Sequence, residues 1–221
     1  MTIHRCDLMF AANRFSIRSI GILVTMNLAG WCFVDSSLAR AASVTTLTFG
    51  EIPFQSVDDL SYAGVTFDFQ IGGVDSAEAF YNSFGPGTLT YVNDPTLTGD
   101  SAGVLALDFD VPASAVEFGM ALNTANALSP GFRVELFSPA FVSLGETPVD
   151  VFPTVGALGF SENRFQYAGD PISRAVIRFN HQPGSFALDN LIFQLVPEPS
   201  ALIASIIAVT AIVLRARGRA N

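Results

Sequence analysis

The chain contains no lysine, and the residues beyond position 41 contain no cysteine and no tryptophan, because Cys6, Cys32 and Trp31 all lie before that point. Residues 42–196 therefore form no disulfide and no thiolate zinc site, and they offer no cysteine nucleophile. A folded domain in this part of the chain must rely on its hydrophobic core or on bound ions. Without tryptophan, only tyrosine and phenylalanine rings are available to stack on a sugar.

The motifs of common enzyme classes are also missing. Beyond position 41 the single histidine is His181, which lies in an expected turn. There is no Gly-x-Ser-x-Gly elbow, no His-Glu-x-x-His, no phosphate-binding glycine loop and no dinucleotide fingerprint. The sequence therefore predicts a protein that is not an enzyme. A small glycan hydrolase stays an alternative, because its two carboxylates are paired in space and leave no fixed spacing in the sequence.

Positive charge is scarce in the central part of the chain. Residues 42–199 hold four arginines against eighteen aspartates and glutamates, and the whole chain has a net charge of −9. This balance excludes nucleic acid and anionic membranes as partners attracted by the field of the domain. It suits a surface protein, either through solubility alone or through binding of divalent cations.

The C-terminal segment has three features in a fixed order. Pro197-Glu198-Pro199 comes first, an uncharged apolar run over residues 201–214 follows, and the chain then becomes basic at Arg215, Arg217 and Arg219. At about 1.5 Å per residue this run forms a helix of roughly 21 Å, shorter than the hydrocarbon layer of about 30 Å. The pattern predicts a short transmembrane helix with a basic stop. The alternative is a buried C-terminal helix of the domain.

The N-terminal segment is typical of a secretory signal peptide. Arg14 and Arg18 precede an apolar stretch over residues 20–34, and Ala39-Arg40-Ala41 supplies a small-residue cleavage site. We expect a signal helix within residues 1–41 and cleavage after Ala41. If translation began at Met9, the charged region before the apolar stretch would have a length more usual for a signal peptide. Basic residues flank the inner side of both apolar segments, so both chain ends are expected in the cytoplasm and the domain outside it.

The C-terminal arrangement resembles the PEP-CTERM sorting tag of exported proteins from Gram-negative bacteria that make exopolysaccharide. The resemblance implies that Pro197, Glu198 and Pro199 are the recognition element in a tag over residues 197–221. It implies passage through the secretion translocon, transient anchoring in the inner membrane with the domain in the periplasm, and processing by an exosortase-type membrane peptidase. The expected destination is the cell surface or the extracellular matrix of a biofilm.

Between the two ends, the hydrophobic pattern has a period of two. Residues 65–71, 116–122 and 132–136 alternate apolar and polar side chains, as half-buried strands do. Further strand candidates are 44–49, 88–92, 104–109, 141–144, 163–167, 172–179 and 186–195. Turn clusters rich in glycine, proline and asparagine separate them. We therefore expect residues 42–196 to form an all-β, antiparallel β-sandwich of about ten strands, with a core of phenylalanine.

Two stretches of this domain carry a second resemblance. Thr48-Phe49-Gly50-Glu51 with residues 62–67 is similar to the opening of many PEP-CTERM proteins, and residues 186–193 are similar to the last strand of jelly-roll carbohydrate-binding modules. In such modules an early acidic residue and the aspartate of the last strand commonly bind a structural calcium ion. The resemblance thus implies Glu51 and Asp189 as calcium ligands.

The residues around Asp189 support a special role independently. Both faces of strand 186–195 are mostly apolar, so the strand is expected to be central and the carboxylate shielded, with Asp189 on the face of Leu191 and Phe193. A shielded carboxylate needs a cation, several hydrogen-bond donors or a proton. The alternatives to calcium are a turn-capping aspartate and an ion pair with Arg174 or Arg178. Weaker calcium candidates, expected rather to be solvated, are Asp58, Asp59, Asp108 and Asp110.

Two function classes follow for the domain. The first is a non-catalytic module that binds a glycan such as exopolysaccharide, and the second is a structural or adhesive sandwich that contacts other proteins. Exposed aromatic rings distinguish them, and the best loop candidates are Tyr81 and Phe84 in the polar stretch 79–87. The alternative for these two rings is that they cover the end of the sandwich.

Overall fold

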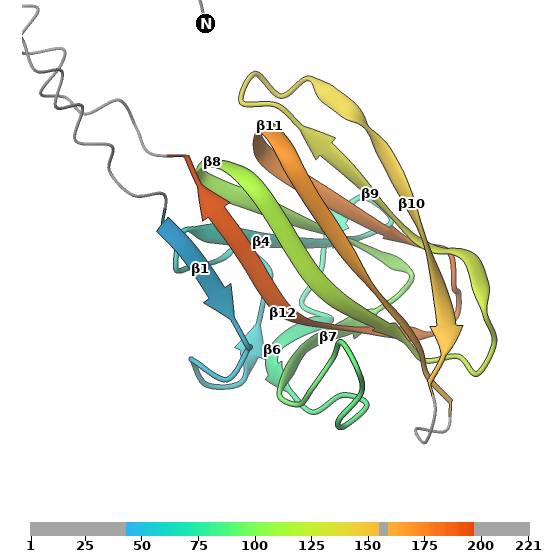
Figure 1. Ribbon diagram of the computed structural model, residues 1–221. Coiled ribbons are helices and arrows are strands. Elements are labelled where there is room, and N and C mark those ends of the chain that lie inside the picture. Colours follow the sequence, from blue (N-terminus) through green and yellow to red (C-terminus); the bar gives the residue numbers. More distant parts are fainter. Residues whose placement is uncertain (1–42, 155–158, 197–221) are drawn as a thin grey trace, which may run out of the picture. The chain divides into compact units, whose positions relative to one another are not determined.

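The computed structural model describes residues 43–154 and 159–196 (Figure 1). The expected signal peptide with its cleavage site at Ala39 and Ala41, and the sorting tag with Pro197, Glu198, Pro199 and its three arginines, lie outside the described residues. Within the described ranges no helix has the length and hydropathy needed to cross a membrane. These ranges are built from strands joined by turns, with no helix.

The domain contains twelve strands among the described residues, and every pairing between them is antiparallel. They are β1 (Ser43–Leu47), β2 (Gln55–Ser56), β3 (Leu60–Tyr62), β4 (Val65–Ile71), β5 (Val74–Asp75), β6 (Ala79–Ser83), β7 (Thr96–Asp100), β8 (Gly103–Leu122), β9 (Leu128–Phe137), β10 (Ser143–Pro153), β11 (Ser161–Phe179) and β12 (Ser185–Leu195). The expected all-β, antiparallel sandwich is confirmed.

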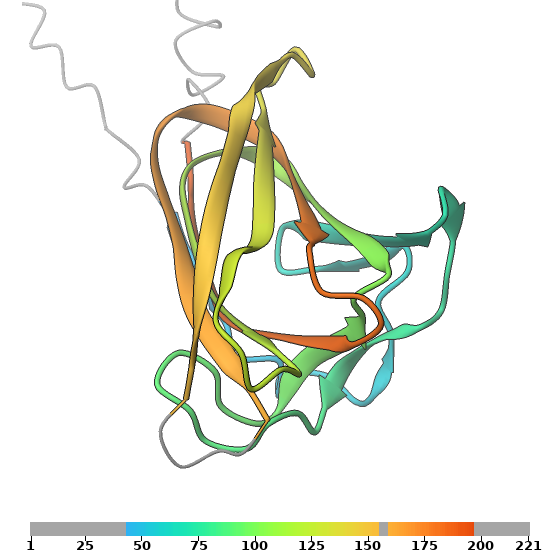
Figure 2. The same cartoon turned by 90° about the vertical axis from the view of Figure 1, so that its right-hand side faces the viewer.

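Two long strands belong to both layers of the sandwich. The first half of β8 pairs with β4 and with the second half of β11, which also pairs with β9. The second half of β8 pairs with the first half of β11 and with β12. We call the layer of β3, β4, β9 and β10 the first layer, and the layer of β1, β12, β7, β6 and β2 the second layer. Figure 2 shows both long strands curving as they pass between the layers.

The change of layer occurs where the pairing of β8 and β11 is interrupted. The register shifts between Ala168 and Ile172 and again before Arg174, opposite residues 108–113 of β8. Pro112 and Pro171 lie in these segments, and proline cannot donate a ladder hydrogen bond. Bends of this kind let a strand turn the corner between two packed sheets. The sequence prediction had divided each long strand into two, at these interruptions.

Other departures from the prediction involve short elements. Residues 88–92 form no strand and make one isolated bridge, from Thr88 to Asn93. Ser129-Pro130-Gly131 is one of the glycine- and proline-rich clusters for which a turn was expected, and it lies inside β9. Strands β2, β3, β5, β6 and β7 have two to five residues each, too few for a period of two to be recognised.

Phenylalanine rings fill the space between the layers. Phe186 of β12 stacks on Phe179 of β11 with ring centroids 4.3 Å apart, and it contacts Phe69 of β4 at 6.0 Å. The ring centroids of Phe109 in β8 and Phe193 in β12 lie 5.3 Å apart, with the rings tilted against each other. All five rings are buried. Burial of each such ring contributes a few kcal/mol, which compensates for the absence of disulfides.

Truncation of Phe186 tests this core. Phe186→Ala leaves a cavity between the layers, so we expect the free energy of unfolding to fall by about 3–5 kcal/mol in urea denaturation. The matched control is Phe152→Ala, because Phe152 is 57% exposed on β10 and its loss should change stability by less than about 0.5 kcal/mol. Equal effects of the two substitutions would contradict the assignment of Phe186 to the core.

Candidate ligand-binding groove and its supporting loop

A bulge in β12 places Asp189 on the outer face of the second layer. Asp189 pairs with Gly119 and Ile192 pairs with Glu117, so β12 has one residue more than β8 in this interval. Asn190 takes up the extra residue with a φ of 52°. Leu188 and Leu191 both face the core as a result. The expectation that Asp189 shares a face with Leu191 is therefore wrong, whereas its burial, with 1% of the residue exposed, is confirmed.

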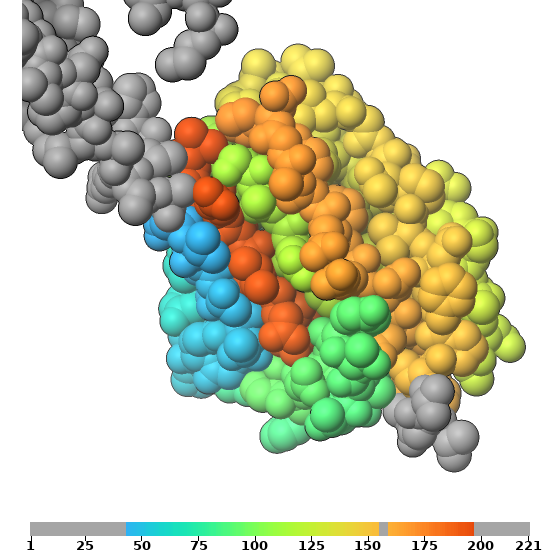
Figure 3. Space-filling view, in the orientation of Figure 1, coloured from blue at the N-terminus to red at the C-terminus, as the bar shows by residue number. Residues whose placement is uncertain are grey.

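Residues 84–95, here called the covering loop, bury Asp189 by folding over the outer face. Val92 packs on Ala121 and Ala187, with Tyr91 and Leu89 beside them. Small residues on the sheet make this approach possible: a Cβ at Gly119 would lie 2.1 Å from the backbone oxygen of Tyr91. In Figure 3 the large green surface below the lower end of the red β12 belongs to this part of the chain, whereas the yellow-green patches between β12 and the orange β11 belong to β8.

Two buried carboxylates hold the covering loop by its backbone. Glu162 of β11 accepts hydrogen bonds from the amides of Thr90 and Tyr91, at 2.9 and 2.8 Å. Asp189 accepts one from the amide of Asn93 at 2.8 Å. The side-chain amide of Asn190 donates to the Tyr91 oxygen and to Asp189. Hydrogen bonds to charged acceptors are the stronger ones in proteins, so these contacts fix the loop.

Asp189 thus acts as a cap for the loop, and none of the arginines that the structure describes pairs with it. Arg174 pairs with Asp108, with both contacts at 2.6 Å, and Arg178 pairs with Glu135 at 2.8 Å. The Oδ1 atom of Asp189 is buried and has no hydrogen-bond partner among the described residues. Burial raises the pKa of Asp189 to about 6; the amides of Asn93 and Asn190 oppose this shift, and the nearby charges of Glu51 and Asp94 add to it.

The other expected calcium ligand, Glu51, lies in the turn after β1 and is exposed. Its Oε1 accepts hydrogen bonds from the amide and hydroxyl of Thr48, at 2.7 and 2.9 Å, and its Oε2 accepts one from the Tyr81 hydroxyl. Partial burial raises the pKa of Glu51, but the hydrogen bonds from Tyr81 and Thr48 outweigh it and lower the pKa overall.

Tyr81 lies in the core, and its ring has no face left for a ligand. It is 0% exposed and contacts Phe49, Tyr62 and Phe67 with ring centroids 4.9–6.3 Å apart. The structure therefore corrects the expectation that Tyr81 stacks on a sugar. The alternating burial of β6 turns Tyr81 inward and leaves Phe80 on the outer side.

Phe84 is 86% exposed and lines an open groove of about 430 Å³ on the outer side of β6, β7 and β12. Phe80 and Phe160 line the same groove, and Phe80 also stacks on the exposed Phe54 with ring centroids 5.1 Å apart. The polar lining includes the carboxylates of Glu78 and Asp100 and the hydroxyls of Thr98 and Ser185. The sequence indicated Phe84 but missed Phe80 and Phe160, which are far apart in the chain.

Another, smaller groove of about 300 Å³ lies on the outer face of the first layer. Cross-strand pairing places Asp68, Ala106 and Val176 in one row across β4, β8 and β11. Phe141, which is 63% exposed, stands at the groove beside Arg174, whose guanidinium lies 5.9 Å from the ring centroid. Its arginines are already paired with acids, so this face has little free positive charge to offer a ligand.

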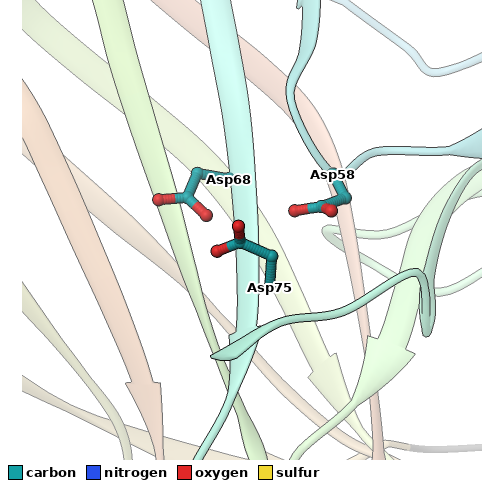
Figure 4. A group of neighbouring side chains, drawn as sticks. All are labelled: Asp58, Asp68 and Asp75. Carbon is teal, nitrogen blue, oxygen red and sulfur yellow. The ribbon is translucent and has the colours of Figure 1, made fainter. Parts of the chain in front are cut away.

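Three carboxylates meet in another place, near the β4–β5 hairpin. Oxygens of Asp58, Asp68 and Asp75 lie within 4.8 Å of one another (Figure 4). Glu51 and Asp189 do not belong to this group. The sequence indicated Asp58 as a weaker calcium candidate, expected rather to be solvated, and singled out neither Asp68 nor Asp75.

Comparisons with known proteins concern the fold alone. No family model and no curated protein matches the chain. Among solved structures, a family 29 carbohydrate-binding module from Piromyces equi is 8% identical with a TM-score of 0.36, over 70% of this chain and 91% of the other. The CBM22-1 xylan-binding domain of Xyn10C from Paenibacillus barcinonensis is 14% identical with a TM-score of 0.35, over 72% and 97%.

The K3 cleaved adhesin domain of Lys-gingipain from Porphyromonas gingivalis is 12% identical with a TM-score of 0.37, over 69% of this chain and 99% of the other. At these values the likeness is one of β-sandwich architecture. The case for function therefore rests on the groove and on the residues that line it.

The buried carboxylate of Asp189 predicts a pH dependence of stability in the presence of a chelator. Because its pKa is raised in the folded state, its contribution to stability is complete below about pH 4 and is lost as the pH rises through about 6. Asp189→Asn keeps an acceptor for the Asn93 amide and does not titrate. As the pH rises from 4 to 7, the free energy of unfolding of the wild type should fall relative to that of Asp189→Asn by on the order of 2–3 kcal/mol. Urea denaturation at each pH measures this difference.

Asp189→Ala is the companion variant, because it removes the acceptor altogether. The amide of Asn93 then loses its partner, and the melting temperature should fall at every pH. Parallel pH curves for wild type and Asp189→Asn, or an unchanged melt for Asp189→Ala, would contradict this account of the loop.

Proposed function

We propose that this protein is an exported, non-catalytic surface or matrix protein that binds a glycan in the Phe84 groove. The observation that carries the proposal is the combination of the exposed Phe84 ring and the half-buried Phe80 and Phe160 rings with carboxylates and hydroxyls in one open groove. Aromatic faces stack on the C–H faces of sugar rings, and the polar groups accept and donate hydrogen bonds to sugar hydroxyls. Open grooves suit a long polysaccharide chain, because the chain can extend beyond both ends.

The covering loop supports this function by fixing one wall of the groove before a ligand arrives. Phe84, Gly85 and Pro86 line the groove, and the amide of Gly85 donates to Asp94 at 2.8 Å within the same loop. Glu162 and Asp189 anchor the following residues. A wall that is already ordered reduces the entropy lost on binding.

Export and sorting are part of the proposal and rest on the chain ends. The secretion translocon and an exosortase-type peptidase are the proposed partners during export, and exopolysaccharide is the proposed partner afterwards. Structural calcium at Glu51 and Asp189 is part of the same proposal. The buried, unpartnered Oδ1 of Asp189 supports it, whereas Glu51 already receives three hydrogen bonds from Thr48 and Tyr81.

A glycan hydrolase is the second candidate, and one observation favours it: Glu78 and Asp100 line the same groove. A hydrolase would release new reducing ends from the polysaccharide over time. Our proposal expects binding without any release. A structural or adhesive role without glycan binding is the remaining alternative, and the binding experiment below decides it.

The binding test uses the purified protein and the exopolysaccharide of the cells that produce it. We expect Phe84→Ala to weaken binding about tenfold, since loss of one stacked ring removes about 1 kcal/mol or more. Phe152→Ala is the matched control, another exposed phenylalanine that lies outside this groove. Affinity is measured by calorimetry, with calcium and with chelator.

Three results would contradict the proposed site. The wild type could fail to bind under either condition, Phe152→Ala could weaken binding as much as Phe84→Ala, or Phe141→Asn alone could abolish it. The last result would move the site to the outer face of the first layer. Asparagine is chosen at position 141 because that residue has a φ of 56°.

Sorting is tested separately at the Pro-Glu-Pro motif. Replacement of Pro197, Glu198 and Pro199 by alanine should leave the protein uncleaved in the membrane fraction, whereas the wild type should appear as a shorter form at the surface. Mass spectrometry should find Ala42 as the first residue of both forms. A variant that is processed and released normally would refute the role of the motif.

A further inference from the structure

We infer that Asp58, Asp68 and Asp75 form a binding site for a divalent cation, with calcium the best match. The site is distinct from the pair Glu51 and Asp189. It does not depend on glycan binding. Figure 4 shows the three carboxyl groups directed toward one another from separate segments of the chain.

Each carboxylate is held in place by an ordered element. Asp68 lies on β4, which pairs with β8 along its whole length. Asp75 lies on β5, opposite Gln70, in a hairpin closed by Gly72 and Gly73. Both glycines have positive φ, 61° and 79°, as a tight two-residue hairpin requires.

Asp58 is positioned by a turn between β2 and β3. The amide of Leu60 donates to the oxygen of Val57 at 3.0 Å, and Val57 is buried and donates its own amide to Ala79 at 3.0 Å. The side chain of Asp58 therefore reaches the cluster from a fixed backbone. None of the three segments needs to move to bring the oxygens together.

Three negative charges this close repel one another, and the surrounding residues compensate for them only in part. The Gln70 amide donates to Asp68 at 3.4 Å and to Asp75 at 3.2 Å. Arg174 is the cation that acts on Asp68, but its Nε and Nη2 atoms both donate to Asp108. A bound cation would supply the missing positive charge.

A second observation points to a ligand independently of the charge. The Oδ1 atom of Asp58 is buried and has no hydrogen-bond partner among the described residues. A buried carboxylate oxygen without a donor costs free energy unless a cation binds it. The Asp58 carboxyl group points into the cluster rather than away from it.

The chemistry of the donors selects the cation. All three offer carboxylate oxygens, with no histidine or cysteine in the group, and such hard ligands favour calcium or magnesium over zinc or copper. Calcium accepts six to eight oxygens in flexible geometry, so water can complete its shell. Magnesium demands a stricter octahedron, which favours calcium at a site of three carboxylates at the edge of a sheet.

The experiment measures the full protein after treatment with chelator. Calcium chloride should raise the melting temperature by several degrees at millimolar concentration, beyond sodium chloride at the same ionic strength, and calorimetry should detect calcium binding. Asp58→Asn and Asp75→Asn should each weaken calcium affinity at least tenfold. In chelator, each should melt higher than the wild type, because one of three repelling charges is gone.

The matched control is Asp59→Asn. Asp59 is the next residue of the same turn and is exposed, so its substitution should leave the calcium response unchanged. Asp189→Asn probes the other proposed calcium position and is measured beside it. Absence of calcium stabilisation in the wild type would overturn the inference. So would an undiminished response in both Asp58→Asn and Asp75→Asn, or a response that Asp189→Asn alone abolishes. Glycan affinity is measured in a separate experiment, so failure of the calcium site is distinguished from failure of the proposed glycan site.

Discussion

The fold depends on one constraint: β8 must pair along its twenty residues with strands of both layers. Its first half is bonded to β4 and its second half to β12, while β11 pairs with both halves, on either side of an interruption. With no disulfide in the described domain, these ladders and the phenylalanine core between them hold the layers together. The bends near Pro112 and Pro171 are therefore structural features, because they let the two strands change layer without losing their partners.

The outer face of the second layer follows from this arrangement. Where β8 and β12 meet, the outward residues are Gly119, Ala121 and Ala187, and they leave room for the covering loop. Glu162 and Asp189 then bind the loop backbone at places where larger apolar residues would have blocked it. This arrangement buries Asp189 and raises its pKa. It also orders the wall of the groove that carries Phe84.

Much of the fold could be predicted from the sequence, because period-two patterns persist in strands such as β4 and β9. The bulge at Asn190 could not, because a bulge is defined by the partner strand, and so Asp189 was placed on the wrong face. Tyr81 looked like a loop aromatic because β6 is too short to show its alternation. The short strands β2, β3 and β5 carry Asp58 and Asp75 toward Asp68, and nothing in the linear order of these residues indicates that they meet.

Nuclear magnetic resonance of the labelled protein during titration with the exopolysaccharide tests the central claim most directly, because it locates the ligand without any substitution. The account predicts that amide and aromatic shift changes centre on Phe80, Phe84, Thr98, Asp100 and Ser185, with the covering loop already ordered in the free protein. Changes confined to the outer face of the first layer, or a covering loop that becomes ordered only with ligand, would contradict it.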